Sequence, residues 1–104
     1  MIRRTFVMRL KPGSLAEYKR RHDEIWPELV EAMREAGFRN YTLFRRGTQV
    51  IAYSECYPDA ATVNAKIAAT EPDQRWNKWF EDIIVAMTDE NGKLFQYEEV
   101  WHQD

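Results

Sequence analysis

The sequence predicts an α+β fold in which four antiparallel strands form one sheet and helices cover one of its faces. Apolar residues alternate over positions 2–10, recur at three- and four-residue spacing over 14–37, and alternate again in two aromatic-rich runs that follow. A second helical pattern and a last strand complete the chain. The order strand, helix, strand, strand, helix, strand is that of the ferredoxin-like βαββαβ fold.

The first strand is predicted over residues 2–10. The buried side of this strand carries Ile2, Phe6, Met8 and Leu10, and the other side carries Arg3, Thr5, Val7 and Arg9. This alternation is the two-residue period of a strand with one face in the core. Lys11, Pro12 and Gly13 then turn the chain into a helix.

The long helical pattern runs from Ser14 to Gly37. Its inward stripe comprises Leu15, Tyr18, His22, Ile25, Trp26, Leu29, Val30 and Met33. Ser14 and Glu17 have the spacing of a capping box, and Gly37 can close the helix in the left-handed conformation. Pro27 removes one helical hydrogen bond, so a kink or a break is expected just past His22.

Two runs rich in aromatic and β-branched residues, 38–46 and 49–57, predict an antiparallel hairpin around Gly47. Asp59 is placed to cap a short helix that carries Val63 and Ile67.

A further helix is expected from Thr70 and Pro72, because proline is favoured in the first helical turn. Its apolar stripe comprises Trp76, Trp79, Phe80, Ile83, Ile84 and Met87. Asn91 and Gly92 then turn the chain into a last strand over 94–102.

The second face of the sheet is also apolar. Val7, Ile51 and Tyr53 point to it, and the last strand has apolar residues on both sides. A monomer rarely leaves so much apolar surface in water. Packing two sheets face to face would bury it, so the sequence predicts a homodimer in the form of a dimeric α+β barrel.

Composition limits the possible functions. A chain of 104 residues is the size of one domain, predicted over 1–104. The net charge is −2 with the two signs interleaved, so neither nucleic acid nor a membrane surface is an expected partner. A single cysteine, Cys56, cannot form an internal disulfide. A cytoplasmic, reducing setting is therefore expected.

His22 is the candidate for chemistry, because it is a polar residue on the inward stripe of its helix. Tyr18 lies one turn before it, so the two side chains are neighbours. An imidazole can donate and accept protons near neutral pH. An inward histidine is, however, also a common hydrogen-bonded core residue, and the pattern alone leaves both interpretations open.

Aromatic residues near His22 suggest a sugar site, because a pyranose has apolar C–H faces and polar hydroxyl edges. Trp76 and Tyr41 are the candidate rings, although a tryptophan stripe is also typical of a core. Polar residues that can line the same pocket are Arg4, Asn40, Gln74, Arg75 and Asn77. The sequence contains no phosphate-binding glycine loop, no nucleophile elbow and no Cys or His cluster for a metal.

The segments MIRRTFVM, EYKRRHDEIWPEL, RNYTLF, QRWNKW and EEVW resemble the L-rhamnose mutarotase family over nearly the whole chain. The resemblance implies a dimeric α+β barrel that interconverts the α and β anomers of L-rhamnose, or of a related deoxysugar or aldose, without a cofactor. It implies that His22 is the catalytic proton donor and that Tyr18 and Tyr41 bind the sugar.

The family also contacts the sugar through two adjacent tryptophans. This chain has Trp76 at the first of these positions and Asn77 at the second, and Trp79 lies one turn further on as a possible replacement. An amide in place of an indole adds hydrogen-bonding capacity, so the resemblance leaves the sugar preference open.

Two other functions fit the same residues. A non-catalytic domain that binds a small ligand is the main alternative, since this fold hosts many functions. A haem-binding oxygenase of the related dimeric barrel type, with His22 as the axial ligand, is the other.

Overall fold

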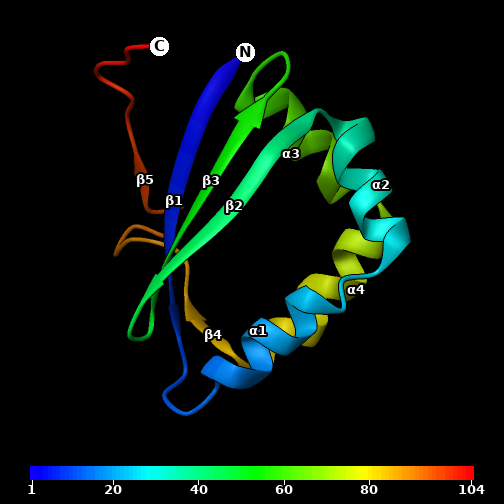
Figure 1. Ribbon diagram of the computed structural model, residues 1–104, viewed down its shortest axis with the longest axis vertical. Coiled ribbons are helices and arrows are strands. Elements are labelled where there is room, and N and C mark those ends of the chain that lie inside the picture. The colour runs from blue at the N-terminus through cyan, green and yellow to red at the C-terminus, as the bar shows by residue number, and fades with distance from the viewer.

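The computed structural model describes all 104 residues, and it confirms the predicted ferredoxin-like α+β architecture (Figure 1). The sheet is antiparallel throughout, with the order β2-β3-β1-β4 and with β5 paired to β1. The strands are β1 (Ile2–Leu10), β2 (Phe38–Arg46), β3 (Gln49–Cys56), β4 (Ile84–Ala86) and β5 (Gln96–Tyr97).

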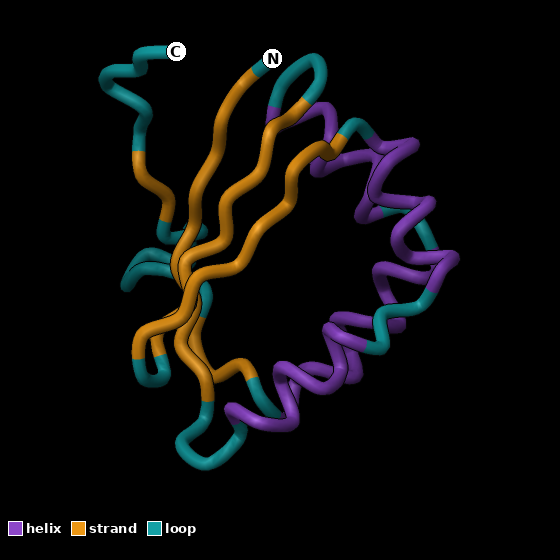
Figure 2. The backbone as a smooth tube through the Cα atoms, in the orientation of Figure 1, coloured by secondary structure: helices purple, strands orange, loops and turns teal.

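The helices form a second layer on one face of this sheet, as Figure 2 shows. They are α1 (Leu15–Asp23), α2 (Pro27–Ala36), α3 (Ala60–Ala68) and α4 (Glu71–Trp79), and a 3₁₀ turn over Phe80–Asp82 follows α4. None of the helices is long and apolar enough to span a bilayer.

The predicted break after His22 is confirmed. Helix α1 ends at Asp23, and α2 begins with Pro27 in its first turn. A backbone N–H at this position has no partner within the helix, so proline costs no helical hydrogen bond there. Val30, expected on the inward stripe, is 47% exposed, whereas its neighbour Leu29 is buried as expected. Gly37 closes α2 with a φ of 117°, as predicted.

The predicted capping box at the start of α1 is wrong. Ser14 Oγ donates to the carbonyl oxygen of Lys11 at 2.6 Å instead of accepting from the helix. Glu17 accepts hydrogen bonds from Arg20 and Arg21, because two guanidinium groups lie within its reach on the same helix face. The predicted cap of α3 is confirmed, since Asp59 accepts from the amide of Thr62 at 2.8 Å.

The end of the chain differs from its prediction. Helix α4 stops at Trp79 rather than continuing to Met87, and Ile84–Ala86 is a strand that pairs with the end of β1. The predicted last strand is reduced to Gln96–Tyr97, which pairs with the middle of β1. Two short segments thus pair with one edge of β1. The N–H and C=O groups of that edge need hydrogen-bond partners, and supplying them is favoured over continuing the helix that the periodicity predicts.

The core lies between the two layers. Leu10 and Val50 are fully buried on the inner face of the sheet, and Phe80 and Ile83 pack against that face from the other layer. The outer face has no covering layer, and on it the side chains of Phe44 and Ile51 are 59% and 38% exposed.

Candidate active site

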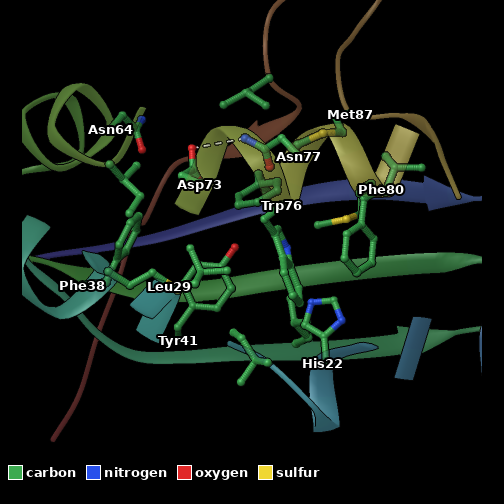
Figure 3. Close-up of a pocket in the computed structure, with 18 of the residues that line it drawn as sticks. His22, Leu29, Phe38, Tyr41, Asn64, Asp73, Trp76, Asn77, Phe80 and Met87 are labelled. Atoms are coloured by element: carbon green, nitrogen blue, oxygen red, sulfur yellow. Dashed lines mark hydrogen bonds between the residues drawn. The ribbon is translucent and has the colours of Figure 1, made fainter. Parts of the chain in front are cut away.

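A cavity of about 230 Å³ lies between the inner face of the sheet and the helices (Figure 3). Fifteen of its twenty lining residues are hydrophobic, and the other five are Arg4, His22, Asn64, Asp73 and Asn77. A wider open groove of about 930 Å³ adjoins it and shares His22 and Tyr41 with it. An apolar cavity with a few polar groups is the usual form of a small-molecule site.

The last turn of α1 brings His22 to the cavity wall. Its Nδ1 lies 2.9 Å from the carbonyl oxygen of Tyr18. A carbonyl can only accept, so Nδ1 carries the proton and Nε2, which has no protein partner, is the ring nitrogen left for a ligand. Burial lowers the pKa of His22 below its usual value near 6.5, and the hydrogen bond to Tyr18 acts in the opposite direction.

Aromatic rings hold the imidazole in place. The ring of Tyr18 lies 4.4 Å from that of His22, centroid to centroid, and the rings of Trp76 and Phe80 each lie 5.2 Å from it at steep angles. These contacts leave His22 half-buried with its orientation fixed, as a proton-transfer group requires.

Tyr18 lines the cavity, but its hydroxyl group does not reach His22. The hydroxyl lies 3.7 Å from the thioether sulfur of Met8, and burial raises the pKa of the Tyr18 phenol. The two residues are therefore neighbours, as expected. They contact each other through their rings and through the hydrogen bond to the Tyr18 carbonyl oxygen, and the phenol does not hydrogen-bond to the imidazole.

A β-bulge in β2 turns Tyr41 toward the cavity. The register between β2 and β3 shifts between Arg39 and Thr42, and Asn40 takes the left-handed conformation with a φ of 51°. The amide of Asn40 donates to Glu55 at 2.9 Å on the neighbouring strand. The extra residue places Tyr41 on the inner face, and burial raises the pKa of its hydroxyl to about 12.

Trp76 lies beside His22 in the cavity wall, but Trp79 does not replace the missing second tryptophan. Trp79 stacks on Trp26 at 5.4 Å with an interplanar angle of 12°, and it is absent from the lining of the cavity. Asn77 lines the cavity, and its amide donates to Asp73 at 3.2 Å.

Of the other predicted polar residues, only Arg4 faces the cavity. Gln74 donates to the carbonyl oxygen of Ala68, Arg75 pairs with Glu28, and Asn40 borders only the outer groove. The sequence interpretation missed Asn64 and Asp73, which both line the cavity. Of these two residues, only Asp73 carries a signal in the sequence, which is its four-residue spacing from Asn77.

No three of the chain's His, Cys, Asp and Glu side chains converge in a group that can hold a metal ion.

The chain is similar in sequence to L-rhamnose mutarotases. The family model for L-rhamnose mutarotase matches residues 3–103. The L-rhamnose mutarotase of Tolumonas auensis is 38% identical, and that of Escherichia coli O8 is 30% identical, each over 98% of both chains.

Solved structures show the same fold. The L-rhamnose mutarotase FA22100 of Formosa agariphila superimposes with a TM-score of 0.78 and 25% identity, with full coverage of both chains. Tetracenomycin F2 cyclase of Streptomyces glaucescens, a type-II polyketide cyclase, has a TM-score of 0.58 and 18% identity, with 100% of this chain and 98% of the cyclase covered. The latter likeness concerns the fold alone.

Proposed function

The chain belongs to the L-rhamnose mutarotase family, and we propose that its cavity binds L-rhamnose and interconverts the α and β anomers through proton transfer at His22. The observation that carries this proposal is the free Nε2 of His22 in the wall of an otherwise mostly apolar cavity. The proposed activity is that of an isomerase of the aldose 1-epimerase type. Membership of this family favours an enzyme over a non-catalytic binding domain.

In the first step, Nε2 of the neutral imidazole accepts the proton of the anomeric hydroxyl. The hydrogen bond from Nδ1 to the Tyr18 carbonyl stabilises the imidazolium that results. As the bond between C1 and the ring oxygen breaks, the electron pair of that bond goes to the ring oxygen, which takes the proton from Nε2. The product is the open-chain aldehyde with a hydroxyl at C5.

Rotation about the C1–C2 bond then presents the other face of the carbonyl. The C5 hydroxyl attacks C1 and gives up its proton, the carbonyl oxygen gains one, and the ring closes as the opposite anomer. His22 ends in its starting state, and each step moves only protons and one C–O bond. Trp76 and Tyr41 hold the sugar from two sides, while Tyr18 positions His22.

Polarimetry tests this function directly. A solution prepared from one pure anomer of L-rhamnose should reach its equilibrium rotation faster with the protein than in buffer, in proportion to protein concentration. L-fucose, L-mannose and D-glucose serve as comparison sugars. Acceleration for another sugar alone would keep the chemistry and reassign the substrate, and no acceleration for any sugar would refute the proposal.

The activity should depend on pH through His22. Because burial lowers the pKa of His22, the imidazole is neutral above about 6.5, and acceleration should be constant there and fall as the pH drops through the lowered pKa. An acceleration that instead increases toward acidic pH would show that the cycle starts from the imidazolium. The measurement is the protein-dependent rate constant between pH 5 and 8, corrected for the buffer rate.

We also propose that two copies pack through the outer faces of their sheets. Phe44 and Ile51 are exposed there, and Trp101 in the carboxyl-terminal segment is 75% exposed. Apolar side chains on neighbouring strands form a patch of the kind that protein–protein interfaces bury.

Light scattering at micromolar concentration should give twice the chain mass of 12.4 kDa. The substitution Ile51→Lys places a charge at the centre of the proposed interface and should reduce the mass to that of one chain. Val30→Lys, at an exposed apolar residue of α2 in the helical layer, is the control and should leave the mass unchanged. A wild-type protein with the mass of a single chain would refute the dimer.

Finally, we propose that residues 1–104 form one domain that works in the cytoplasm. Its only cysteine, Cys56, is free and fully buried between sheet and helices, which suits a reducing compartment.

A further inference from the structure

Arg4 is a buried cation without an anionic partner. Its side chain lies on the inner face of β1, and the residue is 7% exposed. Nη1 donates to Asn64 at 2.7 Å, Nε has no partner, and no carboxylate lies within ion-pair distance of the guanidinium. A desolvated charge is costly unless other groups satisfy it. Because Arg4 lines the cavity, an oxygen atom of a bound ligand can supply the missing partner.

Asp73 is the matching anion in the same cavity. It accepts one hydrogen bond, from Asn77, and has no cation beside it. Burial raises the pKa of the Asp73 carboxyl, and the bond from Asn77 acts in the opposite direction. Arg4 and Asp73 therefore both face the cavity, and they do not form an ion pair with each other.

Tyr41 lines the same cavity as these two charged residues. Burial raises the pKa of the Tyr41 hydroxyl, while the charge of Arg4 lowers it and that of Asp73 raises it further. Figure 3 shows Asn64 and Asp73 toward one end of the cavity and His22 toward the other, with Trp76 between them. A pyranose with C1 and its ring oxygen at His22 would therefore direct its opposite edge, which carries the other hydroxyl groups, toward Arg4 and Asp73.

We propose that Arg4 and Asp73 form a hydroxyl-binding subsite, in which Arg4 donates to and Asp73 accepts from neighbouring hydroxyl groups on the sugar edge remote from the ring oxygen. Asn64 and Asn77 orient the two charged groups. The ligand class is a neutral aldopyranose with free adjacent hydroxyls on that edge. This inference rests on the proposed function, because His22 fixes which end of the sugar is which.

The test is a binding titration of L-rhamnose and its 2-, 3- and 4-deoxy analogues, followed by tryptophan fluorescence, together with polarimetry. Arg4→Met and Asp73→Asn should each raise the Kd for L-rhamnose about 10- to 100-fold, as expected for the loss of a hydrogen bond to a charged group. For each variant, one deoxy analogue lacks the hydroxyl group that the substituted residue contacts. Wild type should bind this analogue with a higher Kd than L-rhamnose, and the variant should bind both sugars with the same Kd. This loss of discrimination marks a direct contact.

Arg9→Met on the same strand and Glu71→Gln on the same helix are matched controls, since both residues are exposed. They should leave every Kd unchanged. Far-ultraviolet circular dichroism and the melting temperature identify a variant that does not fold, in which case Arg4→Lys, which keeps the charge but donates differently, replaces Arg4→Met. Variants that fold and keep the wild-type discrimination ratios would overturn the subsite.

The failure of the proposed function gives a different result. Wild-type protein that binds L-rhamnose without accelerating mutarotation would refute the catalytic role, while the titration would still decide the subsite. Wild-type protein that binds none of the sugars would overturn the subsite as well.

Discussion

Replacing His22 by glutamine should lower the protein-dependent mutarotation rate of L-rhamnose by about 10²- to 10⁴-fold, the usual contribution of one positioned acid–base group. Glutamine has a similar size and can still donate to the Tyr18 carbonyl, but it cannot exchange a proton. The variant should therefore keep its sugar affinity within about threefold, because it loses only an interaction made in the transition state. Polarimetry measures the rate, and tryptophan fluorescence measures the Kd.

The only other histidine provides the control. His102 lies in the exposed carboxyl-terminal segment, where its ring contacts Arg3 and Asp104. His102→Gln should leave both rate and affinity unchanged. A His22→Gln variant that binds sugar and retains more than half of the wild-type rate would remove His22 from the mechanism.

Replacing Gly37 by alanine should destabilise the protein by roughly 3–5 kcal/mol. The φ of 117° is unfavourable for any residue with a Cβ. A Cβ at this position would also clash with the carbonyl oxygen of Tyr57 and lie 2.9 Å from Cγ2 of Val63, which is fully buried. The carbonyl oxygen of Gly37 also accepts a hydrogen bond from the amide N–H of Tyr57. Relief of the clash would therefore move β2, α3 or both.

Thermal unfolding followed by circular dichroism measures this effect at equal protein concentration, and a fall in Tm of about 15 °C or more is expected. Gly13→Ala is the matched control. Gly13 also has a positive φ, 85°, but a Cβ there meets nothing within 4 Å. It should cost about 1–2 kcal/mol, the conformational penalty alone. Equal losses for the two variants would show that the close approach to Tyr57 is unimportant.

Local patterns were sufficient to predict most of the fold. Alternation placed β1 at Ile2–Leu10 with its observed bounds, and Pro27 marked the break between α1 and α2. These features depend on residues close together in the chain. The end of α4 depends on long-range contacts instead. Arg21 of α1 donates to the carbonyl oxygen of Trp79 and pairs with Asp82, and β1 offers a free edge to Ile84–Ala86. A periodicity argument has no access to such contacts.

The candidate site was predictable in part for the same reason. His22, Tyr18 and Trp76 lie on helical stripes, so their inward direction follows from spacing. The inward turn of Tyr41 depends on the bulge at Asn40, which the sequence interpretation did not foresee. Asp73 sits among exposed residues at the start of α4, and only the packing of that helix against the sheet places it in the cavity.

Exchange NMR of L-rhamnose at anomeric equilibrium tests the central claim most directly. Saturation of the α anomeric proton should be transferred to the β anomeric proton in the presence of wild-type protein, at a rate proportional to its concentration. With the same concentration of His22→Gln, the transfer should return to the rate in buffer. Equal transfer with both proteins, or no transfer beyond buffer with folded wild type, would contradict the assignment of mutarotation to this cavity.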